Sequence, residues 1–406
     1  MSKIIKTPSN SPIMGRIATH VNELCPEGVE IQPLGDVCEI LRGKRVTKSD
    51  IKPQGTYPVI SGGITPMGYM EDYNREPNTI TVSQYGTAGY VDFQRVKFWA
   101  NDICYCLYPK QNLNNEFLWY VLKDKQNYLY EIRNTDATPF SLPSETLKSV
   151  QIPLPPLSIQ QEIVSVLDTF TTLIDKMKQE VEKRKKQMEY YCDLYYGGDI
   201  EGMMALANDS NNSVITFAEL GTITRGKRFV RDDVRESGQP CIHYGDMYTY
   251  YGTKSYRANT YLDRDFPKKM RYANKGDVVI VGAGENDYDI GVGVVWMGDE
   301  SAAVHDACYI LEHSQNPMYI SYYLRSNIYH QQLKKYVSSG KISSFSAEGL
   351  GKVYIPIQPI EKQNEIVSTL DKFESYITKL EKMIVLRQKQ YEYYREQLLT
   401  FENIKH

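Results

Sequence analysis

The stretch from Ser158 to Tyr196 reads SIQQEIVSVLDTFTTLIDKMKQEVEKRKKQMEYYCDLYY, and a second version of it runs from about Glu361 to Phe401. In both copies large apolar residues recur at alternating spacings of four and three, the a/d pattern of a helix that packs against another helix. The second copy follows 203 positions later in the same register, with Arg184 and Arg387 at the same step. A shared arginine indicates duplication of one helix rather than two unrelated amphipathic helices.

We call these apolar positions the a/d stripe. Its core members are Ile163, Leu167, Phe170, Ile174, Met177 and Val181 in the first copy, and Ile366, Leu370, Phe373, Ile377, Leu380 and Ile384 in the second. At 1.5 Å per residue each helix is roughly 60 Å long. Two identical stripes are complementary, so the helices are expected to pack on each other; the alternative is that each lies on a separate domain.

Local signals set the helix ends. Proline disfavours helix in the residue before it, so each helix is expected to begin only after its last proline, Pro156 or Pro359. Ser158 and Gln161 have the spacing of a capping box, and the pair Gly197 and Gly198 predicts the end of the first helix. Arg184 and Arg387 are costly to bury alone, so each should meet a carboxylate, or lie at a bend or a partner surface.

The whole chain has 406 residues, which is enough for two or three domains, and a net charge of -3. It has no apolar run long enough to span a membrane and no apolar N-terminal signal segment. Its seven cysteines are scattered in no disulfide framework, which is typical of a cytoplasmic protein with reduced thiols.

The rest of the chain reads as two strand-rich domains, each followed by one long helix. Short strands are expected at 57–60, 79–82 and 90–93, and a helix at 117–130. The expected divisions are a flexible N-terminus (1–15), a first domain (16–150), the first long helix (151–198), a polar linker (199–213), a second domain (214–352) and the second long helix (353–406).

The two domains also resemble each other. Arg42-Gly43-Lys44-Arg45 with Lys48 is matched by Arg225-Gly226-Lys227-Arg228 with Arg231, and Asp102-Ile103-Cys104-Tyr105 is matched by Asp306-Ala307-Cys308-Tyr309. The repeating unit is therefore a domain followed by a helix, present twice.

Motifs for catalysis are missing from the sequence. Its glycine-rich segments complete neither a dinucleotide-binding fingerprint nor a Walker motif, and no nucleophile elbow occurs. Cys104 with Cys106, and His305 with Cys308, are single ligand pairs without a second pair at zinc spacing. The sequence favours a non-catalytic protein with no metal or cofactor of its own.

Binding chemistry is better represented. The clustered cations suit DNA phosphates, and their glycine would let the backbone approach closely; the alternative is a solvated hairpin tip with surface charges. Polar loops around Gln84 and Ser338 carry donors and acceptors that could read base edges. The candidate DNA-binding residues are Arg42, Lys44, Arg45, Lys48, Gln84 and Tyr85 in the first domain, and Arg225, Lys227, Arg228, Arg231, Ser338 and Lys341 in the second.

With this plan and the motifs at both helix starts (152–170 and 355–373), the chain resembles the specificity subunit of Type I restriction-modification systems. The Phe-Ser pairs at 140–141 and 345–346 and the opening Leu24-Cys25-Pro26-Glu27-Gly28 support the resemblance. The second copy departs from the pattern at Gln358 and Glu361, which puts its helix cap in doubt.

The resemblance implies an α+β protein with two strand-rich α/β target-recognition domains, two long helices in an antiparallel coiled coil and a pseudo-twofold internal repeat. It implies a bipartite double-stranded DNA target whose gap the helices measure. It also implies partners: two methyltransferase subunits, which hold S-adenosylmethionine and modify adenine, and two restriction (nuclease-translocase) subunits. Two alternatives remain open: a DNA-modifying enzyme with unrecognised catalytic residues, and a coiled-coil scaffold with two protein-binding heads.

Overall fold

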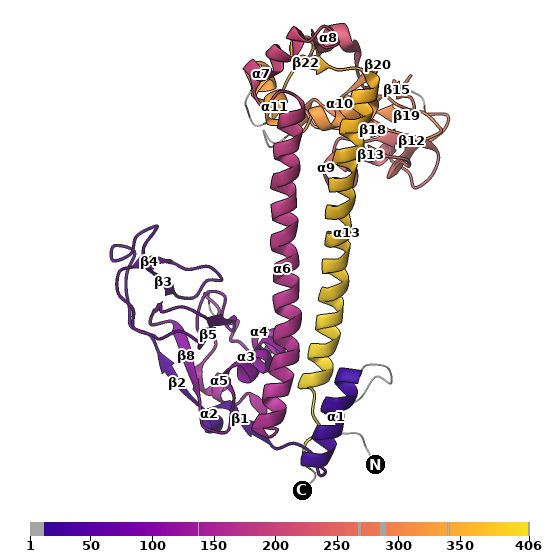
Figure 1. The fold of residues 1–406 in the computed structure, drawn as a ribbon. Helices are drawn as coiled ribbons and strands as arrows, with labels where there is room; N and C mark the ends of the chain where they lie inside the picture. Colours follow the sequence, from indigo (N-terminus) through magenta and orange to yellow (C-terminus); the bar gives the residue numbers. More distant parts are fainter. Residues whose placement is uncertain are drawn as a thin grey trace. The chain divides into compact units, whose positions relative to one another are not determined.

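The computed structural model describes residues 12–136, 138–266, 269–284, 290–338, 340 and 342–404. The chain divides into two compact units, the first holding residues 1–177 and 383–406 and the second residues 178–382. Each unit contains one strand-rich head and one part of each of two long helices, α6 (Leu157–Tyr195) and α13 (Ile360–Leu399) (Figure 1). Within the described residues, none of the helices is long and apolar enough to cross a membrane.

Proline marks the start of both long helices, and glycine marks the end of α6. Both start directly after their last proline, as the sequence predicts. After Tyr195 the backbone turns through Gly197 and Gly198, whose φ angles of 111° and 82° favour glycine. The Gly198 amide donates to the Asp193 carbonyl at 2.7 Å, which closes the helix end. The predicted stop is thus confirmed.

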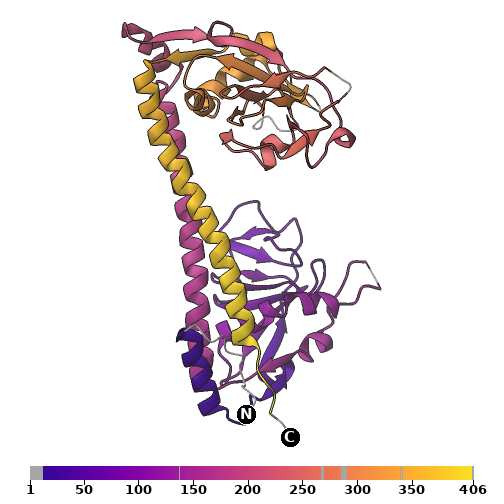
Figure 2. The ribbon, with the colours of Figure 1, turned by 90° about the vertical axis from the view of Figure 1, so that its right-hand side faces the viewer.

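The two helices pack antiparallel within each unit (Figures 1 and 2). In the first unit the Phe170 ring lies 5.2 Å from the Tyr394 ring. In the second, Tyr191 stacks on Phe373 at 5.5 Å, and further along the pair Lys185 Nζ lies 2.9 Å from a Glu381 carboxylate oxygen. The fold is therefore α+β, with an antiparallel helix pair and an internal repeat.

The a/d stripe faces this packing. Ile163, Leu167 and Leu370 are completely buried, and Phe170, Phe373 and Ile384 are partly buried. The remaining six members, Ile174, Met177, Val181, Ile366, Ile377 and Leu380, are all buried. Removing such side chains from water supplies about 1.5–3 kcal/mol each, so this stripe is a main source of helix pairing.

The shared arginines find polar partners. Arg184 lies 2.7 Å from the Glu180 carboxylate and 5.6 Å from the Tyr376 ring centroid. Arg387 donates to the Gln390 side-chain oxygen at 2.7 Å. The prediction of a carboxylate partner is confirmed for Arg184, whereas the bond of Arg387 goes to a neutral amide.

The capping-box prediction at Ser158 is wrong. Ser158 is the second residue of α6, which begins at Leu157 directly after Pro156, so Ser158 is inside the helix and cannot be its cap. The helix start is instead held by Gln160, which is completely buried and whose amide donates to the Pro155 carbonyl at 2.7 Å. Gln363 does the same for the Gln358 carbonyl at 2.8 Å.

The first head is the strand-rich part of the first unit, from β1 to β9. Its central antiparallel sheet has the order β2-β8-β5-β6, a three-stranded sheet has the order β4-β3-β7, and β1 pairs with β9. The bounds are β1 Ile31–Pro33, β2 Cys38–Arg42, β3 Tyr57–Ile60, β4 Gly68–Met70, β5 Thr79–Ser83, β6 Val91–Gln94, β7 Trp99–Ala100, β8 Cys104–Pro109 and β9 Gln151–Pro153, with helices α1 Pro12–Leu24, α2 Leu34–Val37, α3 Asn115–Asp124, α4 Gln126–Glu131 and α5 Ser144–Lys148.

The second head, from β10 to β22, repeats this plan. Its central sheet has the order β11-β20-β16-β18-β13, and its smaller sheet the order β14-β12-β19-β15. The strands are β10 Ser213–Thr216, β11 Gly221–Arg225, β12 Gln239–Ile242, β13 Lys254–Ser255, β14 Thr260–Leu262, β15 Tyr272–Ala273, β16 Val278–Val281, β17 Ala283–Gly284, β18 Gly293–Trp296, β19 Ala302–Val304, β20 Cys308–His313, β21 Ser343–Ser344 and β22 Tyr354–Ile357. The helices are α7 Ile200–Ala205, α8 Phe217–Leu220, α9 Asp246–Thr249, α10 Pro317–Tyr323, α11 Asn327–Leu333 and α12 Ala347–Gly351, with 3-10 turns η1 Leu206–Asn208, η2 Arg231–Asp233 and η3 Lys334–Tyr336.

Three local expectations need correction. The helix expected at 117–130 is two helices, α3 and α4, separated at Lys125. The polar linker contains α7, which begins after an Asp199 cap and buries Met203 in the core of the second unit. At the N-terminus α1 begins at Pro12 and so overlaps the segment expected to be flexible, of which residues 1–11 lie outside the described part.

Candidate nucleic-acid interface

The basic cluster of the first head begins where β2 ends. Arg42 is the last residue of β2, opposite Tyr105 of β8, with its guanidinium 5.7 Å from the centroid of that ring. Arg42, Lys44, Arg45 and Lys48 are all exposed. Among the residues described, none of the four forms an ion pair, so their charges are available to an anionic ligand. We call residues 42–48 the first basic loop.

The second head builds the same arrangement. Arg225 ends β11 opposite Tyr309 of β20, and its Nε donates to the Asp306 carbonyl at 2.7 Å. Lys227, Arg228 and Arg231 follow it, also exposed and outside the ion pairs of the described chain. We call residues 225–231 the second basic loop.

The glycine of each basic loop has a structural role that differs from the expected one. A Cβ on Gly43 would lie 2.1 Å from the Ala100 carbonyl oxygen, and one on Gly226 would lie 2.2 Å from the His305 carbonyl oxygen. These glycines therefore let the loop pack against the head itself. The expectation that they allow close approach to phosphate is not supported.

Each basic loop is also held by an arginine that the sequence analysis missed. Arg75 donates to the Arg42 carbonyl at 2.6 Å, and Arg271 donates to the Arg225 carbonyl. Each arginine lies in an extended segment that pairs with the smaller sheet of its own head, at equivalent places in the two heads. Matching of motifs between the two heads does not find these two arginines, because the residues on either side of them differ.

The polar loops lie at the same end of each central sheet as the basic loops. In the first head Tyr85 bridges to Ser141, and the Tyr105 hydroxyl donates to the Leu142 carbonyl at 3.1 Å. In the second head Ser338 bridges to Ser344, and the Tyr309 hydroxyl donates to the Phe345 carbonyl at 2.8 Å. Tyr105 and Tyr309 therefore connect the two loops of each head. Each lies opposite the first arginine of a basic loop and contacts the segment that pairs with the polar loop.

The polar candidates differ in accessibility. Tyr85 and Ser338 are exposed, whereas the side chain of Gln84 is buried with 6% of its surface exposed. Gln84 therefore cannot read a base in this conformation, and its backbone instead bonds to Ile103 and Leu142. Lys341 lies outside the described residues.

A second repeated surface lies on the long helices. Two open grooves of about 720 and 620 Å³ occur at α6 and α13, the first in the first unit and the second in the second unit. Each position lining one groove matches a lining position of the other at an offset of 202 or 203. Five of these pairs are identical: Asn114 and Asn316, Val164 and Val367, Ser165 and Ser368, Asp168 and Asp371, and Lys176 and Lys379.

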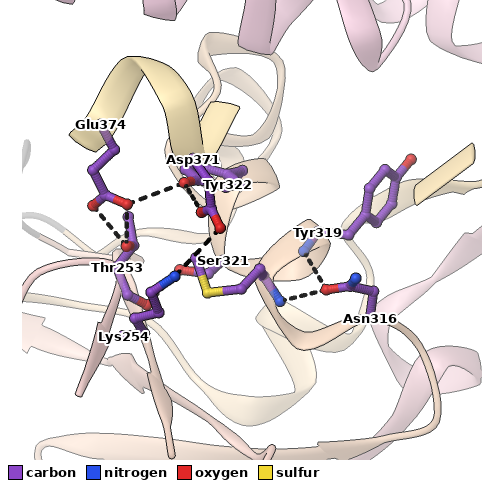
Figure 3. A network of polar contacts seen from close by, with 9 residues as sticks. Thr253, Lys254, Asn316, Tyr319, Ser321, Tyr322, Asp371 and Glu374 are labelled. Carbon is purple, nitrogen blue, oxygen red and sulfur yellow. Dashed lines mark hydrogen bonds and ion pairs between the residues drawn. The ribbon is translucent and has the colours of Figure 1, made fainter. Parts of the chain in front are cut away.

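Each groove is joined to its head by a tyrosine. The Tyr120 hydroxyl donates to Asp168 at 2.6 Å, and the Tyr322 hydroxyl donates to Asp371 at the same distance (Figure 3). Burial and the neighbouring carboxylates raise the pKa of both phenols, so both remain donors at neutral pH. In the second head Lys254 adds an ion pair with Asp371 at 3.4 Å.

Comparisons with known proteins show the family of this chain. A family of Type I restriction modification DNA specificity domains matches the chain twice, at residues 26–183 and 210–387. The chain belongs to this family. A Haemophilus influenzae protein named as a type I restriction enzyme specificity subunit is 29% identical over 92% of this chain and 96% of its own length.

Two solved structures share the fold of this specificity subunit. The S subunit of a Type I restriction-modification system from M. genitalium covers 100% of both chains with a TM-score of 0.61 and 17% identity. A chain from a study of the assembly and conformational transition of a type I system covers 92% of this chain and 98% of its own, with a TM-score of 0.54 and 15% identity.

The possible metal-ligand pairs of the sequence can be placed among the described residues. No group of three or more potential metal ligands occurs there, and all seven cysteines are buried thiols. Cys104 and Cys106 are strand residues of β8, and His305 bonds to the backbone of Phe229 and Ala307. These residues belong to the framework of the heads.

Proposed function

We propose that this specificity subunit reads a bipartite double-stranded DNA sequence, one half-site with each head. The observation that carries the proposal is the pair of equivalent basic loops, whose cations are exposed and form no ion pair within the described parts of the chain, each beside a polar loop. Exposed cations neutralise phosphates and fix the position of the head on the duplex. Neighbouring polar side chains then discriminate base edges.

The two half-sites should differ in sequence. The two heads share a strand plan, but side chains at equivalent loop positions differ. Tyr85, which bridges to Ser141 in the first head, corresponds in its pairing to β17, which pairs with β21 in the second. Because readout depends on side-chain identity and loop geometry, unequal tips imply unequal half-sites. We further propose that the lengths of α6 and α13 set the gap between the half-sites.

The paired grooves support a proposal about partners. A groove retained twice, with five identical pairs of residues, suits two copies of one polypeptide. We assign this polypeptide to the methyltransferase subunit, which would hold S-adenosylmethionine and methylate adenine. In this proposal two restriction subunits join afterwards, and the specificity subunit itself takes no part in the chemistry.

The test is a methylome. The chain is co-expressed with the methyltransferase subunit of its own system in a host without DNA methylation, and modified adenines are mapped by long-read sequencing. One split motif, with two unequal blocks around a fixed gap, is expected. Absence of methylation in a complex that co-purifies would refute DNA reading by the heads, and failure to co-purify would refute the recruitment proposal.

A further inference from the structure

A buried side chain anchors each basic loop. The two anchoring residues occupy equivalent positions but differ in chemistry. Asn101 in the first head and His305 in the second each precede the Asp of the repeated Asp-x-Cys-Tyr motif. The backbone carbonyl of each closes the same turn, accepting from the amide of Cys104 or Cys308 at 3.0 Å. The two positions are therefore structurally equivalent.

In the first head the anchor is an amide. Asn101 has 5% of its surface exposed, and its Oδ1 accepts from the Val46 amide at 3.1 Å while its Nδ2 donates to the Val46 carbonyl at 3.4 Å. Val46 directly follows Arg45 of the first basic loop. One buried side chain thus fixes the loop through both backbone groups of a single residue.

In the second head the anchor is an imidazole. His305 has 9% of its surface exposed, and its Nε2 lies 3.1 Å from the carbonyl oxygen of Phe229, which directly follows Arg228. A carbonyl has no proton, so Nε2 must be the donor. Its Nδ1 accepts from the Ala307 amide at 3.1 Å. These two bonds together define a neutral imidazole with its proton on Nε2.

We infer that Asn101 and His305 are positioning residues for DNA recognition, and that acid releases the second basic loop while leaving the first in place. The inference rests on the proposed DNA-reading function. Protonation of His305 would put a hydrogen on Nδ1, which the Ala307 amide hydrogen already faces. It would also bury a positive charge next to the second basic loop, which carries three cations in addition to Arg225. Asn101 cannot be protonated in this way.

The groups around His305 oppose its charge on balance. The His243 ring lies 4.7 Å away, Tyr244 and Phe229 pack at 5.5 and 5.0 Å, and Arg228 acts from the loop. Asp306 Oδ1, 3.3 Å from Nδ1, is the one carboxylate beside the ring among the described residues, and Asp246 and Arg231 act on His243. Burial, His243 and Arg228 lower the pKa of His305 despite Asp306.

The sign of the effect follows from this lowered pKa. A released loop returns His305 toward the ordinary histidine pKa of about 6.5. The anchored loop is therefore favoured in full above about pH 6.5 and loses stability relative to the released loop as the pH falls below it. Because one proton is involved, the equilibrium between the two shifts by at most about tenfold per pH unit.

The test uses the full chain in complex with its methyltransferase. Competition fluorescence anisotropy compares three duplexes, carrying the complete target, a scrambled first half-site or a scrambled second half-site, between pH 5.5 and 7.5. Discrimination at one half-site is expected to fall several-fold toward pH 5.5, with discrimination at the other half-site unchanged. His305→Asn, which installs the anchor of the first head, is expected to flatten that profile.

Three further variants make the result decisive. His305→Ala should weaken discrimination at the same half-site at every pH, Asn101→Ala should weaken it at the other half-site without pH dependence, and His243→Asn should leave a pH dependence in place. Circular dichroism at each pH confirms that the complexes are folded. A His305→Asn complex with the wild-type pH profile would overturn the inference. If wild type shows no preference for either half-site at pH 7.5, the proposed function itself fails.

Discussion

The hydroxyl of Tyr120 donates a 2.6 Å hydrogen bond to Asp168, which joins the core of the first head to the face of α6 that forms the groove. Tyr322 and Asp371 repeat the bond in the second unit, where the same hydroxyl also lies 3.0 Å from Glu374. Glu374 in turn accepts from Thr253 at 2.6 and 2.8 Å (Figure 3). The same contact therefore positions a head on its helix and orients a groove carboxylate.

Removing these hydroxyls should destabilise each unit. Tyr120→Phe leaves a half-buried carboxylate without its donor, and a hydrogen bond to a charged group contributes about 1.5–3 kcal/mol. Tyr322→Phe should cost more, because its hydroxyl faces two carboxylates. Urea unfolding of the complex measures the change in free energy, with Tyr128→Phe, an exposed tyrosine, as control. Equal stability of Tyr120→Phe and Tyr128→Phe would contradict this role.

Blocking one groove should remove one partner copy. Ser165→Arg and Ser368→Arg place a large charged side chain at equivalent exposed positions, each in a different groove. Native mass spectrometry of co-expressed complexes should show one methyltransferase subunit for either single variant and none for the double variant. Gln179→Arg, at an exposed site on α6 outside the grooves, serves as control. Two bound subunits in the double variant would exclude the grooves as docking sites.

The basic loops should control salt dependence. Replacing Lys44 and Arg45, or Lys227 and Arg228, by Ala should weaken binding to specific and unrelated DNA alike. The slope of log affinity against log salt should decrease by about 0.9 for each lost phosphate contact. Lys148→Ala, at the end of α5, and Lys352→Ala, directly after α12, remove lysines whose ammonium groups pair with Glu145 and Glu348, and they provide the control. An unchanged slope in both double variants would show that these loops do not contact phosphate.

Lengthening the helices should change the gap in the target. Seven residues inserted into both α6 and α13 keep the a/d stripe in register and add about 10 Å of helix. At about 3.4 Å per base pair the gap should grow by up to about three base pairs. Both half-site sequences should stay the same in the methylome. A changed half-site would argue against a spacing role, and a single-helix insertion, which breaks the register, is the control for assembly.

Acid should destabilise the second unit through His313. Burial lowers the pKa of His313 to about 4, below the ordinary value of about 6.5. Its contribution to folding is therefore complete above about pH 6.5 and is lost as the pH falls toward 4. The loss amounts to about 3 kcal/mol, from 1.36 kcal/mol per pKa unit. Urea unfolding between pH 4 and 7 measures it, and His313→Gln should lessen the dependence; no change with pH would contradict the assignment.

The helices were readable from sequence because their cause is periodic. The a/d stripe, the prolines and Gly197 with Gly198 act locally, so the two ends of α6 and the pairing partner followed from residue order. The prediction of a cap at Ser158 was wrong. The side chain that holds the helix start is Gln160, and its partner Asn114 lies far away in sequence. A capping motif is local, so it does not reveal a hydrogen bond between residues far apart in the sequence.

The candidate site was predictable only in part. Runs of charge such as Arg42 to Lys48 show themselves in one dimension, and the structure places them at a strand end. The burial of a side chain cannot be read from the sequence in this way, so the buried Gln84 could not be distinguished from its exposed neighbour Tyr85. Arg75 and Arg271 escaped detection because their function lies in reaching a carbonyl 33 or 46 residues away, with no local pattern around them.

The junction between head and helix is built twice from the same bonds. The Gln160 side chain accepts from the Asn114 amide at 2.7 Å, and the Gln363 side chain accepts from the Asn316 amide at 3.0 Å. A genetic crossover that brings in a foreign head together with its own helix start would carry this junction intact. New DNA specificities can then be inherited as whole cassettes, with no need to refit the joint by successive point mutations.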